Sequence, residues 1–386
     1  MKPLLILFAN LKGNVGDFAI FHAMLEDLSR HYPGRPIHVA THGKHEIDEK
    51  RFHAWRATNP PDFEVIGKLP ALRMPGHMGI FKRVGMNRWL GDRLLTQWTK
   101  TFTETPPVSK SGDYEALFIV GGEWSGFSNT TTMFAAIRAA ARHNRNVFIY
   151  PFSVKKLLLA SQSQTALGAV FSHLAGRIIV RDSHSGDTMR HFRKDTVSSV
   201  DSVFLLGEVA AKLPPAENPD DKLITLAVTI GKGAKTTDLQ QAIVSLQNKG
   251  YRVRLLTTCE REDAVDMLPL SQATGAEFVA PLSWQDVVME FKRSALVVTN
   301  RLHCMIFTFF ADVPLLPLLN REKVVGVRQD AKLTHAIQDV TELTAEKIAE
   351  CLQDRQRTLD EIRSYRQSAI AAHPSPLTAS KPVSAP

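Results

Sequence analysis

Short runs of aliphatic and β-branched residues alternate with helix-length amphipathic segments, and this alternation constrains the fold more than any other feature of the chain. It is typical of βαβ units, in which helices cover a mainly parallel sheet. In the first half the candidate strands are residues 4–8, 37–40, 116–120, 147–150, 177–180 and 200–204. In the second half they are residues 223–230, 252–257, 278–280, 296–298 and 315–318.

A polar, proline-rich stretch at residues 213–220 separates the two series and has the composition of a linker. The chain has 386 residues, which at ~100–200 residues per domain suits two domains. We therefore predict an α/β fold of two doubly wound Rossmann-like domains. This architecture is glycosyltransferase-B-like, with a ligand cleft between the carboxyl ends of the two sheets.

The predicted boundaries follow from the same patterns. The N-terminal domain covers residues 1–208 and the C-terminal domain covers residues 209–345. A long charged helix is expected at 344–366, and the segment 346–372 is expected to pack back on the N-terminal domain. Residues 373–386 are rich in Pro, Ser and Ala, and we expect a disordered tail there.

Composition narrows the function class. The chain is 44% hydrophobic and 22% charged, which excludes a fibrous or wholly disordered protein. No apolar run approaches the ~18–20 residues that cross a bilayer. The three cysteines are odd in number and lack metal-finger spacing, so we expect a reducing, cytoplasmic setting. A net charge of +8 favours an anionic partner, but no nucleic-acid-binding module accompanies it and nucleic acid is not predicted.

The first motif that carries chemistry follows the first candidate strand and includes Asn14, Gly16 and Asp17. Glycine at a strand-to-helix turn allows close approach to a ligand, and free N–H groups at a helix start can bind an anion or a sugar hydroxyl. We interpret these residues as substrate-binding. The alternative is a well-formed turn with Asp17 as the helix N-cap.

The second motif is Gly121-Gly122-Glu123, again at the carboxyl end of a candidate strand. The two glycines suit close backbone approach to a substrate. Glu123 is a candidate base for a substrate hydroxyl, and its alternative role is that of a solvated or structural acid.

The third motif places Arg181 at the end of a buried strand. A fixed guanidinium, with its planar set of donors, suits a carboxylate or a phosphate. The alternative is a structural ion pair with Asp182 or another local acid.

The fourth motif is the sharpest. A buried strand ends at Thr299-Asn300, and a strongly apolar helix begins with Arg301 and His303 in its first turn. Both side chains would lie at the positive end of the helix dipole, a position suited to binding an anion. Alternatively, His303 is a core histidine whose hydrogen bonds are satisfied.

Taken in order, these motifs resemble those of the polysaccharide pyruvyl transferase family. The resemblance rests on residues 14–20, 181–185 and 301–303, followed by Ala-Asp-Val-Pro at 311–314 and Lys323, and it spans roughly residues 4–330. The chain departs from the family at 121–123, where a third glycine is common, and at Phe310, where a smaller residue is usual.

The resemblance implies a transferase that moves a pyruvyl group from phosphoenolpyruvate to two hydroxyls of one sugar. The product is a cyclic ketal on a cell-surface glycan or its lipid-linked precursor, formed with loss of phosphate and without a metal or another cofactor. The N-terminal domain would then hold the acceptor and the C-terminal domain the donor.

The family's chemistry assigns roles to the residues above. Protonation of the methylene carbon requires a general acid, for which His303 is the candidate. Arg181 and Arg301 would neutralise the carboxylate and phosphate of the donor. Glu123 and Asp17 remain alternatives for the base. The predicted substrate-binding residues are Asn14, Gly16, Asp17, Gly121, Gly122, Glu123, Asn300 and Lys323.

Residues 73–100 carry six cationic side chains against one acid, interleaved with Met, Trp and Leu. Such a segment matches an amphipathic helix on an anionic membrane surface, which would place the protein peripherally on the inner face of the membrane, beside a lipid-linked acceptor. The alternative is an ordinary helix that covers the sheet.

Two other functions stay open at this point. A nucleotide-sugar glycosyltransferase of the same fold would need an acidic residue for the ribose, with Glu260 and Glu262 as candidates. A non-catalytic glycan-binding or membrane-adaptor protein would tolerate loss of His303.

Overall fold

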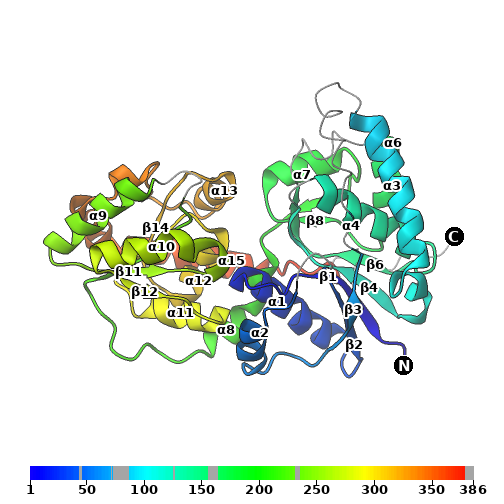
Figure 1. The fold of residues 1–386 in the computed structure, drawn as a ribbon, viewed down its shortest axis with the longest axis horizontal. Helices are drawn as coiled ribbons and strands as arrows, with labels where there is room; N and C mark the ends of the chain where they lie inside the picture. Colours follow the sequence, from blue (N-terminus) through cyan, green and yellow to red (C-terminus); the bar gives the residue numbers. More distant parts are fainter. Residues whose placement is uncertain are drawn as a thin grey trace.

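Two α/β halves lie side by side in the structure, a computed structural model that describes residues 1–42, 46–70, 72, 87–124, 127–154, 164–230 and 235–378. Figure 1 shows the first half in blue to green and the second in green to orange. Each half has a five-stranded parallel sheet with helices against it. The solved structures reported below confirm the predicted fold class.

The first sheet has the strand order β3-β2-β1-β4-β6, which is the doubly wound order with a crossover after the third strand. Every residue of the central strand β1 is buried, as its unbroken aliphatic sequence predicts. The strands are β1 (Leu4–Ala9), β2 (Ile37–Thr41), β3 (Glu64–Lys68), β4 (Ala116–Ile119) and β6 (Val147–Ile149).

A second, four-stranded parallel sheet continues from the first, in the order β5-β7-β8-β9. The chain passes from β4 into it at Gly121 and from β6 at Pro151, where the Gly122 N–H donates to the Pro151 carbonyl at 3.0 Å. Its strands are β5 (Gly122–Trp124), β7 (Phe152–Val154), β8 (Ile179–Val180) and β9 (Val197–Ser198). The segment 200–204, predicted as a strand, instead leads into the short helix η4 (Ser202–Leu206), because Asp201 accepts from the Val203 N–H and caps a turn.

The helices of the first half connect these strands. They are α1 (Val15–His31), α2 (Glu49–Arg56), α3 (Asn87–Glu104), η3 (Val108–Asp113), α4 (Phe127–Ala140), α6 (Gln164–Ser172), α7 (Ser183–Arg190), η4 (Ser202–Leu206) and α8 (Gly207–Ala211).

The second half repeats the doubly wound order as β12-β11-β10-β13-β14, and all five of its strands fall within or beside the predicted runs. The strands are β10 (Leu223–Ala227), β11 (Arg252–Leu256), β12 (Glu277–Val279), β13 (Leu296–Thr299) and β14 (Leu315–Pro317). The helices are α9 (Thr236–Asn248), α10 (Glu260–Thr274), α11 (Trp284–Lys292), α12 (Leu302–Ala311), α13 (Glu322–Asp330), η5 (Val340–Glu342), α14 (Ala345–Gln353) and α15 (Arg355–Ala371).

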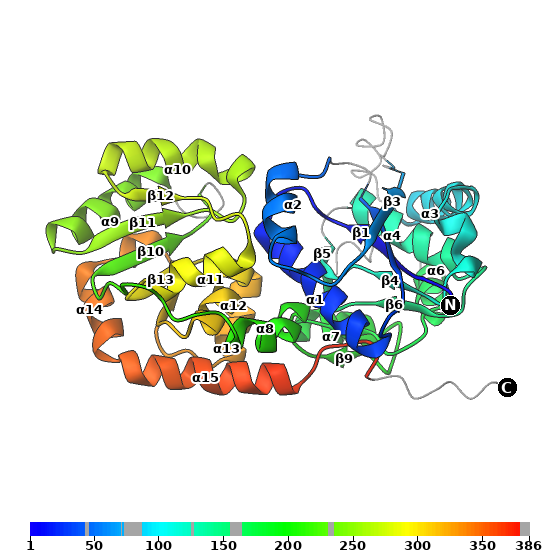
Figure 2. The same ribbon diagram turned by 90° about the horizontal axis from the view of Figure 1, so that it is seen from below.

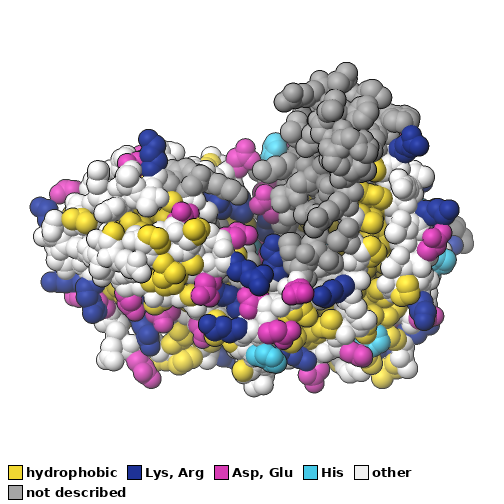
Figure 3. Space-filling model, viewed as in Figure 1, with side chains coloured by type: hydrophobic (Ala, Val, Ile, Leu, Met, Phe, Trp, Pro, Cys, Tyr) yellow, Lys and Arg dark blue, Asp and Glu magenta, His cyan; other side chains and the backbone are white. Residues whose placement is uncertain are grey.

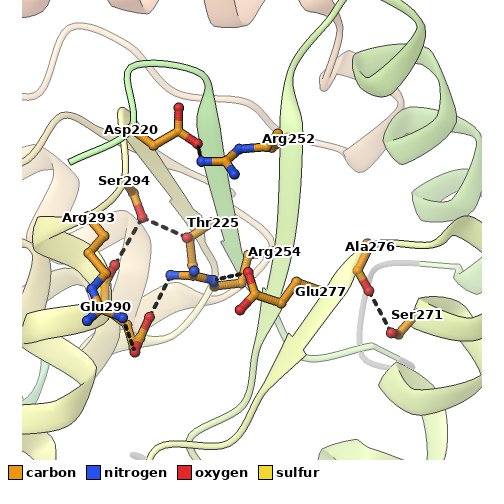
Figure 4. A network of polar contacts seen from close by, with 10 residues as sticks. All are labelled: Asp220, Thr225, Arg252, Arg254, Ser271, Ala276, Glu277, Glu290, Arg293 and Ser294. Atoms are coloured by element: carbon orange, nitrogen blue, oxygen red, sulfur yellow. Dashed lines mark hydrogen bonds and ion pairs between the residues drawn. The ribbon is translucent and has the colours of Figure 1, made fainter. Parts of the chain in front are cut away.

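Polar contacts connect the β11–β12 side of the sheet in the second half to α11 (Figure 4). The guanidinium of Arg254 on β11 donates to Glu277 on β12 at 2.9 Å and to Glu290 on α11 at 2.6 Å. Because the Arg254 side chain is only 9% exposed, these two carboxylates compensate a largely desolvated charge.

The two halves share a continuous apolar core, in which α1 packs against η4 and α11. At its centre, Nδ1 of the buried His22 accepts from the indole N–H groups of Trp55 at 3.3 Å and of Trp284 at 3.0 Å. Trp284 belongs to the second half, so one imidazole joins the halves. Arg51 adds a hydrogen bond across the boundary, to the Pro281 carbonyl at 2.5 Å.

The C-terminal segment differs from its prediction in two ways. The expected single helix is two, α14 and α15, which meet at Asp354. Residues 373–378 are described rather than disordered: Ser375 is fully buried and its hydroxyl donates to Asp27 on α1 at 2.5 Å. The remainder of the predicted tail, 379–386, lies outside the described residues.

Within the basic segment 73–100, the structure describes residues 87–100. Residues 73–86 lie outside the described part of the chain. In α3 the side chains of Leu94, Leu95 and Trp98 are buried in the core of the first half. These apolar groups therefore contact protein, which favours the interpretation as a helix that covers the sheet. The membrane interpretation is not tested.

The junction between the two sheets of the first half leads to a stability prediction. A Cβ on Gly121 would lie 2.1 Å from the Pro151 oxygen and 2.9 Å from the Tyr150 oxygen. Because these are backbone atoms, they cannot easily move to make room for a methyl group. Gly121→Ala should therefore lower the free energy of unfolding by about 1–3 kcal/mol. Urea denaturation monitored by circular dichroism measures this difference.

Gly168→Ala is the matched control, because a Cβ at this position in α6 would have no heavy atom within 4 Å. It should leave the protein equally stable or stabilise it by about 0.5–1 kcal/mol. Equal stability of both variants would show that the junction is not tightly packed.

Candidate active site between the two halves

Loops from both halves meet where the strands of each sheet end. The N–H of Val15, the first residue of α1, donates to the Thr258 carbonyl of the second half at 2.9 Å. A Cβ on Gly16 would lie 2.0 Å from Nδ1 of His303 on α12. Gly16 is therefore required for space: its missing side chain allows the imidazole of the other half to approach α1.

Arg181 follows β8, and its side chain is 3% exposed. Nε donates to the Ser153 hydroxyl at 2.7 Å, and Nη1 donates to the carboxylate of Asp201 at 2.6 Å. Asp182 is not its partner, because Asp182 caps α7 by accepting from the Ser185 N–H at 2.7 Å. The ion pair left open by the sequence therefore exists, with Asp201.

His303 faces the same carboxylate from the second half. Its Nε2 is 3.7 Å from Oδ2 of Asp201, too long for a hydrogen bond, and among the described residues this buried nitrogen has no hydrogen-bond partner. The carboxylate of Asp201 thus lies between Arg181 and His303, which come from different halves.

Asp201 is a residue that the sequence analysis missed. Burial by itself would raise its pKa, but the charge of Arg181 and the interactions with His303 outweigh burial and hold the pKa below its usual range. The available signal was an Asp directly before the mainly apolar segment 202–206. This pattern indicates a helix cap, but it does not indicate a partner for a distant arginine.

Asp17 lies in the same cluster. Burial raises the pKa of this carboxyl, although the charges of His303, Arg181 and Lys323 act to lower it. Its Oδ2 accepts from the Asn10 amide at 2.6 Å. Asp17 does not cap α1; that role belongs to Asn14, whose side chain accepts from the Gly16 N–H at 2.9 Å. The carboxylate of Asp17 is therefore not used to cap the helix.

Lys323 and Glu123 also meet across the two halves, with Nζ 3.0 Å from the Glu123 carboxylate. Burial lowers the pKa of Lys323, which places this amine in a partly desolvated position. Arg321, two residues earlier, has its pKa lowered by burial and then by the charge of Arg301. The sequence analysis did not single out Arg321.

The guanidinium of Arg301, unlike that of Arg181, does not contact Asp201. It pairs with the buried carboxylate of Asp263 on α10 and donates to the Thr258 hydroxyl at 3.3 Å. Arg301 is thus held within the second half, beside Arg321, and not against Asp201. Asp263 is a second acid that the sequence pattern did not reveal.

Three predicted binding residues have structural reasons for their identity. The amide of the buried Asn300 accepts from the Thr229 N–H at 2.7 Å and donates to its carbonyl at 3.1 Å, so it connects two strand ends. Gly121 gives room to the Pro151 carbonyl. Gly122 has φ +101°, a conformation that favours glycine. None of these contacts tests a role in binding substrate.

Several buried polar atoms around these loops have no hydrogen-bond partner among the described residues: Asn10 Oδ1, Arg301 Nε, His303 Nε2 and both amide atoms of Asn320. Buried polar atoms are normally paired, so such a group indicates a place where a polar ligand can bind. Figure 3 shows acidic and basic side chains on the surface where the two halves meet.

Solved structures with a similar fold cover nearly the whole chain. UDP-GlcNAc 2-epimerase from Neisseria meningitidis, bound to UDP-GlcNAc, matches with a TM-score of 0.56 and 10% identity over 96% of this chain and 97% of that one. UGT89C1 from Arabidopsis thaliana matches with a TM-score of 0.56 and 10% identity, over 98% of this chain and 99% of that one. A UDP-glucosyltransferase from Polygonum tinctorium matches with a TM-score of 0.52 and 12% identity, over 97% of both chains. The fold is therefore the two-domain glycosyltransferase-B fold.

The sequence itself identifies the family. The family model for polysaccharide pyruvyl transferase matches residues 14–322. The chain therefore belongs to the polysaccharide pyruvyl transferase family, as its ordered motifs predict, and is a transferase. A comparison with the curated proteins found no match. Over the described part of the chain, no helix has both the length and the apolarity to cross a membrane.

The buried ion pair of Asp201 leads to a second prediction. Asp201→Asn leaves the guanidinium of Arg181 buried without a counter-charge, which should cost about 3–5 kcal/mol in the free energy of unfolding at pH 7. Because the folded pKa of Asp201 is lowered, its contribution is complete above the ordinary value of 3.8 and declines as the pH falls below it. Denaturant unfolding as a function of pH measures both effects.

Asp187→Asn serves as the control. Asp187 pairs with Arg190 on the surface, where the side chains are 77% and 44% exposed, so the loss should stay below ~1 kcal/mol. Similar losses for the two variants would contradict the importance of the Asp201 ion pair.

Proposed function

We propose that this protein transfers a pyruvyl group from phosphoenolpyruvate to two hydroxyls of one sugar, forming a cyclic ketal on a cell-surface glycan or its lipid-linked precursor. The observation that carries the proposal is the convergence of Arg181, His303 and Asp17 on one another from the two halves. Family membership supports the reaction class.

The donor carries a carboxylate and a phosphate, and the site supplies cations for both. Arg181 and Lys323 lie close enough to Asp17 to influence its pKa, and Arg301 lies beside Arg321. We assign Arg181 and Lys323 to one anionic group of the donor. Arg301 and Arg321 are assigned to the other. Cations held by packing stabilise the charge that develops during transfer more than mobile surface cations do.

Proton transfer begins at His303. In the proposed first step, its imidazolium donates a proton to the methylene carbon of phosphoenolpyruvate, which becomes a methyl group and leaves a cationic C2. Asp201, 3.7 Å from Nε2, stabilises the protonated imidazole before the transfer. One sugar hydroxyl then bonds to C2, and the second hydroxyl displaces phosphate to close the ketal.

Each hydroxyl must lose its proton as it attacks; Asp17 is our candidate base for one proton, and His303, left neutral by the first step, accepts the other. Its raised pKa is suited to accepting a proton, and its neighbours His303 and Arg181 are the groups assigned to the donor. Glu123 is less suited because its carboxylate pairs with Lys323. We propose further that this reaction occurs in the cytoplasm and requires neither a metal nor another cofactor.

The reaction itself is the third prediction. Purified protein incubated with phosphoenolpyruvate and a panel of galactosides, glucosides and mannosides should release phosphate and produce a ketal methyl signal in the NMR spectrum. UDP-sugars without phosphoenolpyruvate should give no transfer. Sugar transfer from a UDP-sugar, with no phosphate released from phosphoenolpyruvate, would refute the proposal.

The His303→Ala variant tests the assigned acid in the same assay. Turnover should fall by ~10²–10⁴, the usual contribution of a general acid, with an unchanged circular dichroism spectrum. Turnover near that of the wild type would remove His303 from the mechanism.

The fourth prediction concerns pH. Asp17 acts as a base only when deprotonated, and its pKa is raised, so kcat/KM should fall on the acid side with a midpoint above 3.8. Asp17→Asn should lower kcat by ~10²–10⁴ and abolish this acid limb. Asp221→Asn, which changes an exposed acid directly after the linker, should leave both the rate and the limb intact. Persistence of the limb in Asp17→Asn would exclude Asp17 as the base.

A further inference from the structure

A cluster of metal-ligand type lies at the far end of α1, among residues that the proposed reaction does not use. Asp27 and His31 belong to α1, and His373 follows α15. One ligand atom from each residue lies within 4.8 Å of the others. The three residues are separated by up to 346 positions in the chain, so only the tertiary structure brings them together.

Asp27 is fully buried, and its two carboxylate oxygens differ. Oδ2 accepts from the Tyr150 hydroxyl at 2.7 Å and from the Ser375 hydroxyl at 2.5 Å. Oδ1 has no hydrogen-bond partner among the described residues, yet it lies 3.3 Å from Nδ1 of His31 and 3.8 Å from Nε2 of His373. A buried anionic oxygen that faces two imidazole nitrogens is the arrangement that a cation completes.

We propose that Asp27, His31 and His373 bind a divalent transition metal ion, with Zn²⁺ as the best match. Imidazole nitrogen and carboxylate oxygen are ligands of Zn²⁺ at ~2.0–2.2 Å, which places neighbouring ligands of a tetrahedral site roughly 3.3 Å apart. The separations of 3.3 and 3.8 Å from Oδ1 are close to this value. Mg²⁺ and Ca²⁺ prefer oxygen ligands and suit a site with two imidazoles poorly.

The groups around the carboxylate support metal binding. The Tyr150 hydroxyl donates to Oδ2 of Asp27 at 2.7 Å. Together with Ser375, it fixes the carboxylate so that Oδ1 points to the two histidines. Outer hydrogen bonds of this kind orient metal ligands in known sites. Nδ1 of His31 now lies 2.9 Å from the Asp27 carbonyl, and metal binding through Nδ1 replaces that contact.

The location gives the ion a structural role. α15 is held on the second half, where Arg363 pairs with Asp312 at 2.6 Å and Arg366 donates to the Phe309 carbonyl at 2.8 Å. Beyond α15 the chain runs to the first half, as Figure 2 shows in red. A metal ion on His373 would fasten this segment to α1 and so connect the two halves outside their shared apolar core.

The experiment uses the full chain without a histidine tag, after treatment with a chelator. Titration with ZnCl₂ in a calorimeter should show one saturable site, and Co²⁺ should give the visible absorption of a tetrahedral complex. His31→Ala and His373→Ala should each weaken Zn²⁺ binding at least ~10-fold. His191→Ala, an exposed histidine at the end of α7, should bind as the wild type does.

Proteolysis supplies a second measurement, in which the wild-type chain is compared with and without Zn²⁺. Zn²⁺ should slow cleavage of the wild-type chain between α15 and residue 378, and should not do so in His373→Ala. The proposal fails if no saturable binding occurs, or if the His31→Ala/His373→Ala double variant still binds Zn²⁺ as tightly as the wild type. Neither readout requires the transferase activity.

Discussion

The buried carboxylate of Asp201 is the interaction on which the arrangement of the site depends. Arg181 is almost completely buried, and a guanidinium in that position needs an anion close by. Asp201 provides the anion at 2.6 Å and also faces His303, 3.7 Å away in the other half. One charge therefore fixes the arginine and sets the electrostatic environment of the imidazole. Without it, the two groups assigned to the donor would repel each other whenever the imidazole is protonated.

This arrangement exists only because the two halves are packed closely together. The apolar core that they share continues from α1 to α11 and α12, and His22 accepts from a tryptophan of each half. Gly16 completes the approach, since any side chain there would meet the ring of His303. Contacts far from the reacting groups thus determine the distance between Asp201 and His303. The fold is shared with a UDP-GlcNAc 2-epimerase solved with UDP-GlcNAc bound, and a fold by itself does not determine the chemistry of a site.

The sequence predicted the elements with strong local signals. Aliphatic runs such as 4–8 and 223–230 became the central strands β1 and β10, because a strand buried on both faces needs apolar residues throughout. It missed β3, whose side chains are mostly exposed, and the strands β5, β7 and β9, which have two or three residues each, whereas β8 lies within the predicted run 177–180. It mistook 200–204 for a strand, because the few apolar residues of this short segment do not distinguish a strand from a short helix that Asp201 caps.

The order of the motifs along the chain identified the family, and their positions after strands predicted that Arg181, His303 and Asp17 line one cleft, whereas Lys323 was predicted only from the resemblance to the family. These are local properties: a residue type, a spacing and a strand end. The partners of these groups were decided by the tertiary structure alone. Asp201, Asp263 and Asp27 each meet a histidine or an arginine from a distant segment, and nothing in their own sequence neighbourhood specifies that partner. A buried charge acquires its counter-charge through packing, and packing is a property of the whole chain.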